Sequence, residues 1–178
     1  MGVTRNTKRE LTPATDGPVI FTMRDVPMLE QGTTYENLST AENLWLALKV
    51  YASGGENALH AHQGEDHAFV VMQGKATFTF GDGHTEIVGL HEGVMIPKGS
   101  AYKFEADTAE NLVLLRVGGG NRKVTGLDRL TRFGTPKDVS EQTLDASGAV
   151  KAGRSTQNGE SGKQSVFAEG KFFSPSPR

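Results

Sequence analysis

The sequence has no cysteine, no long apolar run and no excess of basic residues. Without cysteine the chain can form no disulfide framework, thiolate zinc site, iron–sulfur cluster or cysteine nucleophile, so any metal must be held by histidine, carboxylate or tyrosine side chains. The 19 Lys and Arg residues are balanced by 21 Asp and Glu residues, which excludes a strongly basic surface for nucleic acid or an anionic membrane. The N-terminus lacks an apolar run of signal-peptide length, and no apolar stretch approaches a membrane span. We therefore expect a cytoplasmic protein with no nucleic-acid or membrane partner.

Glycine, by contrast, is abundant, with 22 in 178 residues, and it separates short segments in which apolar residues recur at every second position. This period of two is typical of strands, and glycine without matching proline suits the tight turns of an all-β protein. The segments centre on residues 44–51, 67–72, 76–80, 94–96, 102–104 and 112–114. Six or seven short strands at intervals of roughly ten residues predict a β-sandwich or barrel.

The ends of the chain are less regular than this middle part. We predict an N-terminal arm with edge strands over residues 1–39, the barrel over 40–117, and a partly disordered C-terminal extension over 118–178. Apolar residues at spacing three predict a short helix over 125–133, and the polar composition of 134–164 predicts a loose connector. The Phe-rich end of the chain either docks on the domain or a neighbouring subunit, or forms a flexible tail.

All five histidines lie between positions 60 and 91. His60 and His62 are two residues apart, so on a strand both side chains project from the same face, about 7 Å apart. Two such imidazoles can bind one first-row transition metal, and His67, returning on the next strand, can supply a third. We expect His84, in a turn, and His91, before a strand, to be surface residues.

These histidines occur in a pattern that resembles the first motif of the cupin superfamily. That motif reads Gly, five residues, His-X-His, three or four residues, Glu, six residues, Gly. The chain matches every spacing with Gly54, His60–His62, His67 and Gly74, and the glutamate is replaced by His67.

The second cupin motif is matched only in part. It reads Gly, five residues, Pro-X-Gly, two residues, His, three residues, Asn. Alignment on Pro97–Gly99 places His91 at the leading glycine, Tyr102 at the metal-binding histidine and Ala106 at the asparagine.

The resemblance implies an all-β, double-stranded β-helix or jelly-roll barrel that binds a divalent transition metal inside. Carried over by position, the ligands are His60, His62, His67 in place of the glutamate, and Tyr102 in place of the last histidine. Tyr102 either ligates the metal or stands beside it as a hydrogen-bond donor or acid and base, and His67 is the other candidate catalytic residue. Fe(II) is favoured, with Mn, Ni or Zn as alternatives. Glu65 and Asp66 are expected to be turn carboxylates, with a smaller chance of supporting a ligand.

Three neutral imidazoles would leave the full charge of a divalent metal uncompensated, and such a site favours an anionic or chelating substrate. Alternation along the strands turns several aromatic side chains toward the same interior, which suits a hydrophobic or aromatic small molecule. The predicted lining residues are Trp45, Phe69, Phe78, Phe80 and Phe104.

The leading functional hypothesis is a mononuclear non-heme iron oxygenase or dioxygenase. The alternatives are a non-redox isomerase, cyclase or lyase that uses Mn, Ni or Zn, and a non-catalytic small-molecule-binding cupin. The resemblance also implies a homodimer, in which the apolar segment 18–29 or the C-terminal phenylalanines reach the partner.

Overall fold

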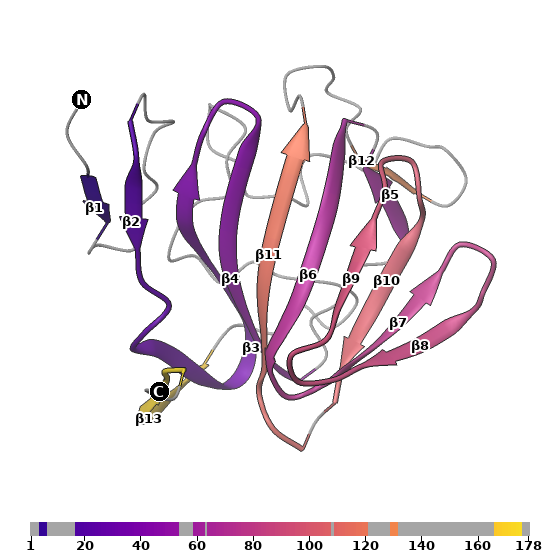
Figure 1. Cartoon of the computed structure of the whole chain (residues 1–178). Helices are drawn as coiled ribbons and strands as arrows, with labels where there is room; N and C mark the ends of the chain where they lie inside the picture. Colours follow the sequence, from indigo (N-terminus) through magenta and orange to yellow (C-terminus); the bar gives the residue numbers. More distant parts are fainter. Residues whose placement is uncertain are drawn as a thin grey trace.

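The computed structural model describes residues 4–6, 17–53, 59–62, 64–107, 109–120, 129–131 and 166–175, and within these ranges the regular elements are all strands (Figure 1). In chain order the strands are β1 (Thr4–Asn6), β2 (Val19–Phe21), β3 (Val26–Thr40), β4 (Leu44–Ser53), β5 (His60–His62), β6 (Glu65–Gln73), β7 (Ala76–Phe80), β8 (Thr85–Val88), β9 (Gly93–Ile96), β10 (Tyr102–Ala106), β11 (Leu112–Gly120), β12 (Arg129–Thr131) and β13 (Val166–Phe173). The predicted all-β class is confirmed.

Two antiparallel sheets form the barrel. One has the strand order β12-β5-β10-β7-β8, and the other has the order β13-β3-β4-β11-β6-β9. Buried side chains from both sheets share one core, as where the ring of Tyr51 on β4 meets that of Phe104 on β10 at 5.1 Å between centroids. Strands next to each other in sequence often lie in different sheets, so the chain crosses between the layers repeatedly. This is the jelly-roll arrangement that the resemblance implied.

The six-stranded sheet is covered on both faces. On β4, Trp45 and Tyr51 face the barrel interior, while Leu48 and Val50 belong to a second core on the outer face. This double burial explains why β4 is apolar at nearly every position, since a strand covered on one side alternates apolar with polar residues.

Segments from both ends of the chain build the second core. β3 carries Val26 and Leu29 into it, and β13, which pairs with β3, adds Phe173. Phe173 is only 5% exposed, whereas Phe167 and Phe172 on the same strand are 56% and 59% exposed. The Phe-rich end therefore docks on the chain's own sheet through one phenylalanine and leaves two in solvent.

The predicted helix over residues 125–133 is wrong for Arg129–Thr131, which form β12 and pair with β5. Pairing with β5 gives the backbone of these residues an extended partner, and such pairing overrides a spacing of three that a short segment shows by chance. The rest of that helix, and the connector predicted over 134–164, lie outside the described residues. Among the described residues, no helix is long and apolar enough to cross a membrane.

Candidate functional site

The three histidines of the first motif meet where the chain passes from one sheet to the other. β5 belongs to the five-stranded sheet and β6 to the six-stranded sheet, and only two residues separate them in the sequence. The rings of His60 and His62 have centroids 5.1 Å apart, and those of His62 and His67 are 4.1 Å apart. His60 and His67 are 3% and 1% exposed, so these polar rings lie inside the barrel.

His62, Glu65 and His67 form a cluster that could hold a metal ion. Each offers one ligand atom, and the three atoms lie within 4.8 Å of one another. Glu65 and His67 are buried and His62 is half-buried, unlike the exposed acidic groups that commonly approach one another without binding a metal. Two imidazoles and one carboxylate fit a divalent first-row transition metal, and the His62–Glu65–His67 cluster could therefore hold one.

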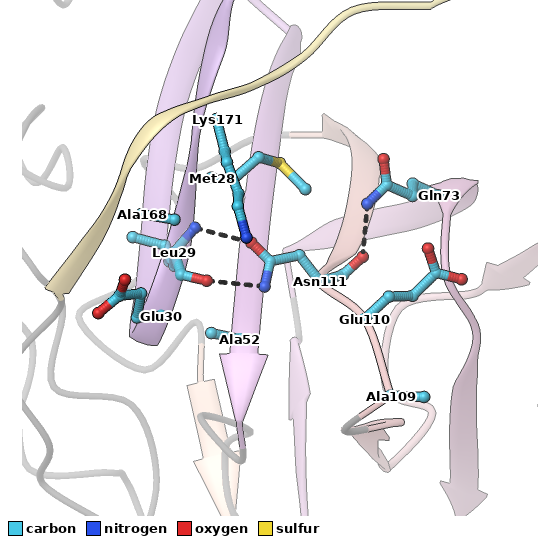
Figure 2. A pocket seen from close by; sticks show the side chains of 10 residues that line it. All are labelled: Met28, Leu29, Glu30, Ala52, Gln73, Ala109, Glu110, Asn111, Ala168 and Lys171. Carbon is cyan, nitrogen blue, oxygen red and sulfur yellow. Dashed lines mark hydrogen bonds between the residues drawn. The ribbon is translucent and has the colours of Figure 1, made fainter.

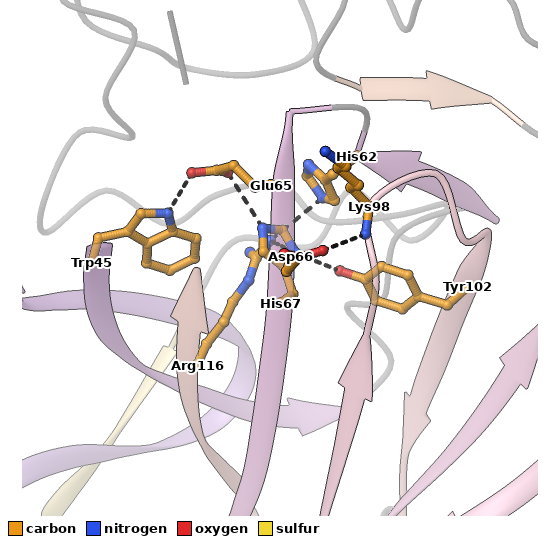
Figure 3. Close-up of polar contacts among 8 residues, drawn as sticks. All are labelled: Trp45, His62, Glu65, Asp66, His67, Lys98, Tyr102 and Arg116. Atoms are coloured by element: carbon orange, nitrogen blue, oxygen red, sulfur yellow. Dashed lines mark hydrogen bonds and ion pairs between the residues drawn. The ribbon is translucent and has the colours of Figure 1, made fainter. Parts of the chain in front are cut away.

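Trp45 fixes the carboxylate of Glu65. Its indole Nε1 donates a 2.7 Å hydrogen bond to Glu65 Oε1, which leaves Oε2 beside His67 Nε2 at 3.4 Å (Figure 3). The indole occupies the space over Gly118 on β11, where an added Cβ would lie 2.2 Å from two of its ring carbons. The absence of a side chain at Gly118 thus allows Trp45 to reach the cluster.

Tyr102 lies next to the cluster on β10, directly opposite His60 in the strand register. Its hydroxyl is 3.3 Å from His67 Nδ1, and its ring centroid is 4.7 Å from that of His60. The side chain is 1% exposed. The structure therefore places Tyr102 in hydrogen-bond contact with a cluster residue.

Arg116 on β11 enters the same site from the six-stranded sheet. Its Nη2 lies 3.1 Å from His67 Nδ1 and 3.5 Å from His62 Nε2, and its guanidinium carbon is 5.0 Å from the centroid of the Trp45 ring. Because a guanidinium only donates, His67 Nδ1 must be the acceptor, and the ring proton of a neutral His67 is then on Nε2, facing Glu65.

The predicted lining phenylalanines occupy two environments. Phe69, Phe78 and Phe104 pack against one another in the barrel core, with ring centroids 5.1 to 5.7 Å apart. Phe80 is partly buried at the rim of that core and stacks on the exposed ring of His84. Their role in holding a substrate stays a prediction.

The other singled-out residues lie outside the cluster. His84 and His91 are exposed, as predicted. Asp66 points away from its neighbour Glu65 and accepts a hydrogen bond from the backbone N–H of Lys98 at 2.8 Å, which holds the second motif against β6.

Sequence reasoning underrated Glu65 and missed Arg116. Glu65 is two residues before His67, so the period of two places both on one face of β6. Arg116 follows the buried Leu112 and Leu114 at the same period of two, so it lies on the inward face of β11. A charged residue on an inward face is unusual, and this was the signal in the sequence that could have identified it.

A separate open pocket of about 530 Å³ lies at β3, β13 and the segment before β11 (Figure 2). It is lined by Met28, Leu29, Glu30, Ala52, Gln73, Ala109, Glu110, Asn111, Ala168 and Lys171. The amide of Asn111 accepts from the N–H of Leu29 at 2.7 Å and donates to its carbonyl at 2.9 Å. Asn111 thus acts as a clamp on β3, and none of the cluster residues reaches this pocket.

The central part of the chain is similar to a known protein family. Residues 47–118 match the Cupin domain family, and a comparison with curated proteins found no match.

Several solved structures are similar to part of the chain. A Cupin 2 conserved barrel domain protein from Leptotrichia buccalis is 24% identical over 53% of this chain and 44% of that chain, with a TM-score of 0.47. A conserved protein of unknown function from Streptococcus pyogenes is 19% identical over 66% of this chain and 99% of that chain, with a TM-score of 0.48. The Cnp3 cupin domain of Schizosaccharomyces pombe is 18% identical over 52% of this chain and 68% of that chain, with a TM-score of 0.47.

The matched residues include β5, β6 and β10, which carry the histidines and Tyr102, and they form most of the two facing sheets. Residues 47–118 are therefore similar to the Cupin domain family.

Proposed function

We propose that the protein is a metal-dependent enzyme, and that Fe(II) bound by the His62–Glu65–His67 cluster makes it a mononuclear non-heme oxygenase. One observation supports this proposal: two imidazoles and one carboxylate converge within 4.8 Å in a largely buried site. That donor set, with positions left open, is typical of non-heme iron oxygenases. Iron held there would supply the electrons for reaction of a bound substrate with O2.

The surrounding side chains are suited to position a small substrate. Trp45 holds Glu65 by its 2.7 Å hydrogen bond, and Tyr102 can orient a polar group of the substrate through the hydroxyl that lies 3.3 Å from His67. The ring of Phe69 packs against those of His67 and Tyr102, and an apolar neighbour strengthens charged interactions beside it. The expected substrate is therefore small, hydrophobic or aromatic, and able to chelate a metal through its open positions.

A second candidate is a non-redox isomerase, cyclase or lyase that uses Mn, Ni or Zn. The hydroxyl of Tyr102 lies at the edge of the cluster, 3.3 Å from His67 Nδ1. A hydroxyl placed there can give a proton to a bound substrate or take one from it, which is the central requirement of these reactions.

Metal binding is the first test of both candidates. The full-length protein, freed of metal with a chelator, is titrated with Co(II), whose visible spectrum reports the ligand set. We expect one equivalent to bind, and we expect His62→Ala and Glu65→Gln each to weaken binding about 10- to 100-fold or more. His84→Ala removes an exposed imidazole and is the matched control. Failure of the wild-type protein to bind Co(II) would leave the non-catalytic binding module as the correct class.

Oxygen consumption separates the two enzymes. The Fe(II)-loaded protein is supplied with catechols, hydroxy ketones and aromatic carboxylates in an oxygen electrode. We expect uptake that is coupled to loss of one substrate and is absent from His62→Ala. Turnover that continues unchanged under strict anaerobiosis would overturn the oxygenase and favour the isomerase, cyclase or lyase.

A further inference from the structure

Arg116 places a positive charge beside the His62–Glu65–His67 cluster, which could itself hold a metal cation. It shares the inward face of β11 with Leu112 and Leu114, which are fully buried. Its guanidinium lies between aromatic rings, 5.0 Å from the centroid of Trp45 and 5.4 Å from that of Phe69. The side chain of Arg116 is half-buried, and its guanidinium points toward the cluster (Figure 3).

This guanidinium has no counter-anion in the part of the chain that the structure describes. The ion pairs formed there do not include Arg116, and its hydrogen-bond partners are ring nitrogens of His62 and His67. Its buried Nε has no hydrogen-bond partner among these residues. Removing a charge from water without an opposite charge is unfavourable, so an anion that entered the site would be stabilised by Arg116.

We propose that Arg116 binds the carboxylate of a small aromatic or apolar acid and so places the substrate beside the His62–Glu65–His67 cluster. The planar fork of an arginine matches the two oxygens of a carboxylate, and such pairs are roughly twice as strong as neutral hydrogen bonds. The rings of Trp45 and Phe69 flank the guanidinium and suit an apolar body attached to that carboxylate. The inference rests on the proposed function only in assuming a metal at the cluster. The anion site itself consists of Arg116 and the rings of Trp45 and Phe69.

Metal binding makes Arg116 available to the anion. A neutral imidazole has one ring nitrogen with a free lone pair, and in His67 that nitrogen is Nδ1, which accepts from Arg116 at 3.1 Å. A metal on His67, at either nitrogen, requires that lone pair, so Arg116 must release the ring. The released guanidinium then repels the metal unless an anion neutralises it. Metal and carboxylate should therefore strengthen each other's binding, and the coupling is reciprocal.

The test uses calorimetric titration of the full-length protein with benzoate and with its neutral counterpart benzamide, both metal-free and loaded with Co(II). We expect the Co(II)-loaded protein to bind benzoate at least about tenfold more tightly than benzamide, and more tightly than the metal-free protein does. Arg116→Gln should weaken benzoate binding about tenfold or more and leave benzamide unchanged. Lys75→Gln removes an exposed positive charge beyond the opposite end of β6 and should change neither.

Equal binding of benzoate and benzamide by the wild-type protein would overturn the proposal. So would unchanged benzoate binding in Arg116→Gln, because the carboxylate would then be held by the metal alone. If Arg116→Gln does not fold, two measurements still test the proposal. One is the comparison of benzoate with benzamide binding by the wild-type protein. The other is benzoate binding by Arg116→Lys, which keeps the positive charge but lacks the planar fork. A protein that prefers benzoate through Arg116 but binds no Co(II) would refute the metal-dependent function and leave the anion site standing.

Discussion

The lack of a side chain at Gly118 allows Trp45 to take its position in the candidate site. Its neighbour Trp45 packs its indole directly over the Gly118 backbone, with ring carbons 2.2 Å from where a Cβ would lie. The same indole donates to Glu65 and meets the ring of His67 edge-on, at 5.5 Å between centroids. One missing methyl group on β11 thereby determines where the carboxylate of the cluster lies.

Gly118→Ala should therefore weaken metal binding without touching a ligand. The added methyl must displace the indole, and a displaced indole loses its 2.7 Å bond to Glu65. We expect about a tenfold loss of Co(II) affinity, in the range found for residues that support metal ligands, and a change in the fluorescence of the single tryptophan.

Gly119→Ala is the matched control for this substitution. A Cβ there would meet its nearest atoms at 3.6 and 3.7 Å, which is ordinary contact. If the Gly118→Ala and Gly119→Ala variants bind Co(II) with equal affinity, Trp45 does not position Glu65.

Residue spacing predicted part of this site and could not predict the rest. The His-X-His pair and His67 are local in sequence, so the period of two and the short connection to the next strand were enough to place them together. Arg116 comes from β11, about fifty residues later, and its approach to His67 depends on the pairing of β11 with β6. Such pairing is set by the whole fold, which no local pattern contains.

At the scale of the element, β3 and β13 make the second core. β3 pairs with β4 through its second half and with β13 through its first, and its register with β4 shifts between Gly32 and Thr33. The amide of Asn111 clamps Leu29 near the shift. A strand from the far end of the sequence thus covers the edge of β3.

Phe173→Ala should destabilise the protein far more than Phe172→Ala. Phe173 is 5% exposed within the second core, and truncation of such a phenylalanine costs about 3 kcal/mol or more. Phe172 is 59% exposed, and we expect its truncation to change the free energy of unfolding by less than about 0.5 kcal/mol. Urea unfolding followed by circular dichroism measures both, and equal losses would show that β13 does not dock through Phe173.

The elements themselves were predictable to different degrees for a physical reason. Strands of the barrel that bury one face alternate apolar with polar residues, strands that bury both faces are apolar throughout, and both patterns are visible in the sequence. β12 has three residues, and its extended form depends on pairing with β5. β8, also unforeseen, has three exposed residues of four, so burial left almost no pattern in its sequence.

At the scale of the molecule, the two ends of the six-stranded sheet differ. β9 forms one edge and β13 the other. β13 exposes three large apolar side chains, Val166, Phe167 and Phe172, which are 43%, 56% and 59% exposed. An edge strand has unpaired backbone groups, and an apolar edge favours pairing with another chain. The edge of β3, in the N-terminal segment expected to reach a partner, is already covered by β13 of the same chain.

We therefore expect a homodimer in which two copies meet along β13. A two-fold axis would place each Phe167 and Phe172 against the partner's strand and bury apolar area that the single chain leaves in water. Sedimentation velocity should give twice the chain mass of 19.1 kDa for the wild-type protein and the monomer mass for Phe167→Glu combined with Phe172→Glu. Ile87→Glu alters a residue that is 66% exposed on β8, at the edge of the other sheet, and should leave the dimer intact. A monomeric wild-type protein, or a double variant that still dimerises, would contradict this arrangement, whereas dissociation by Ile87→Glu would move the interface to the five-stranded sheet.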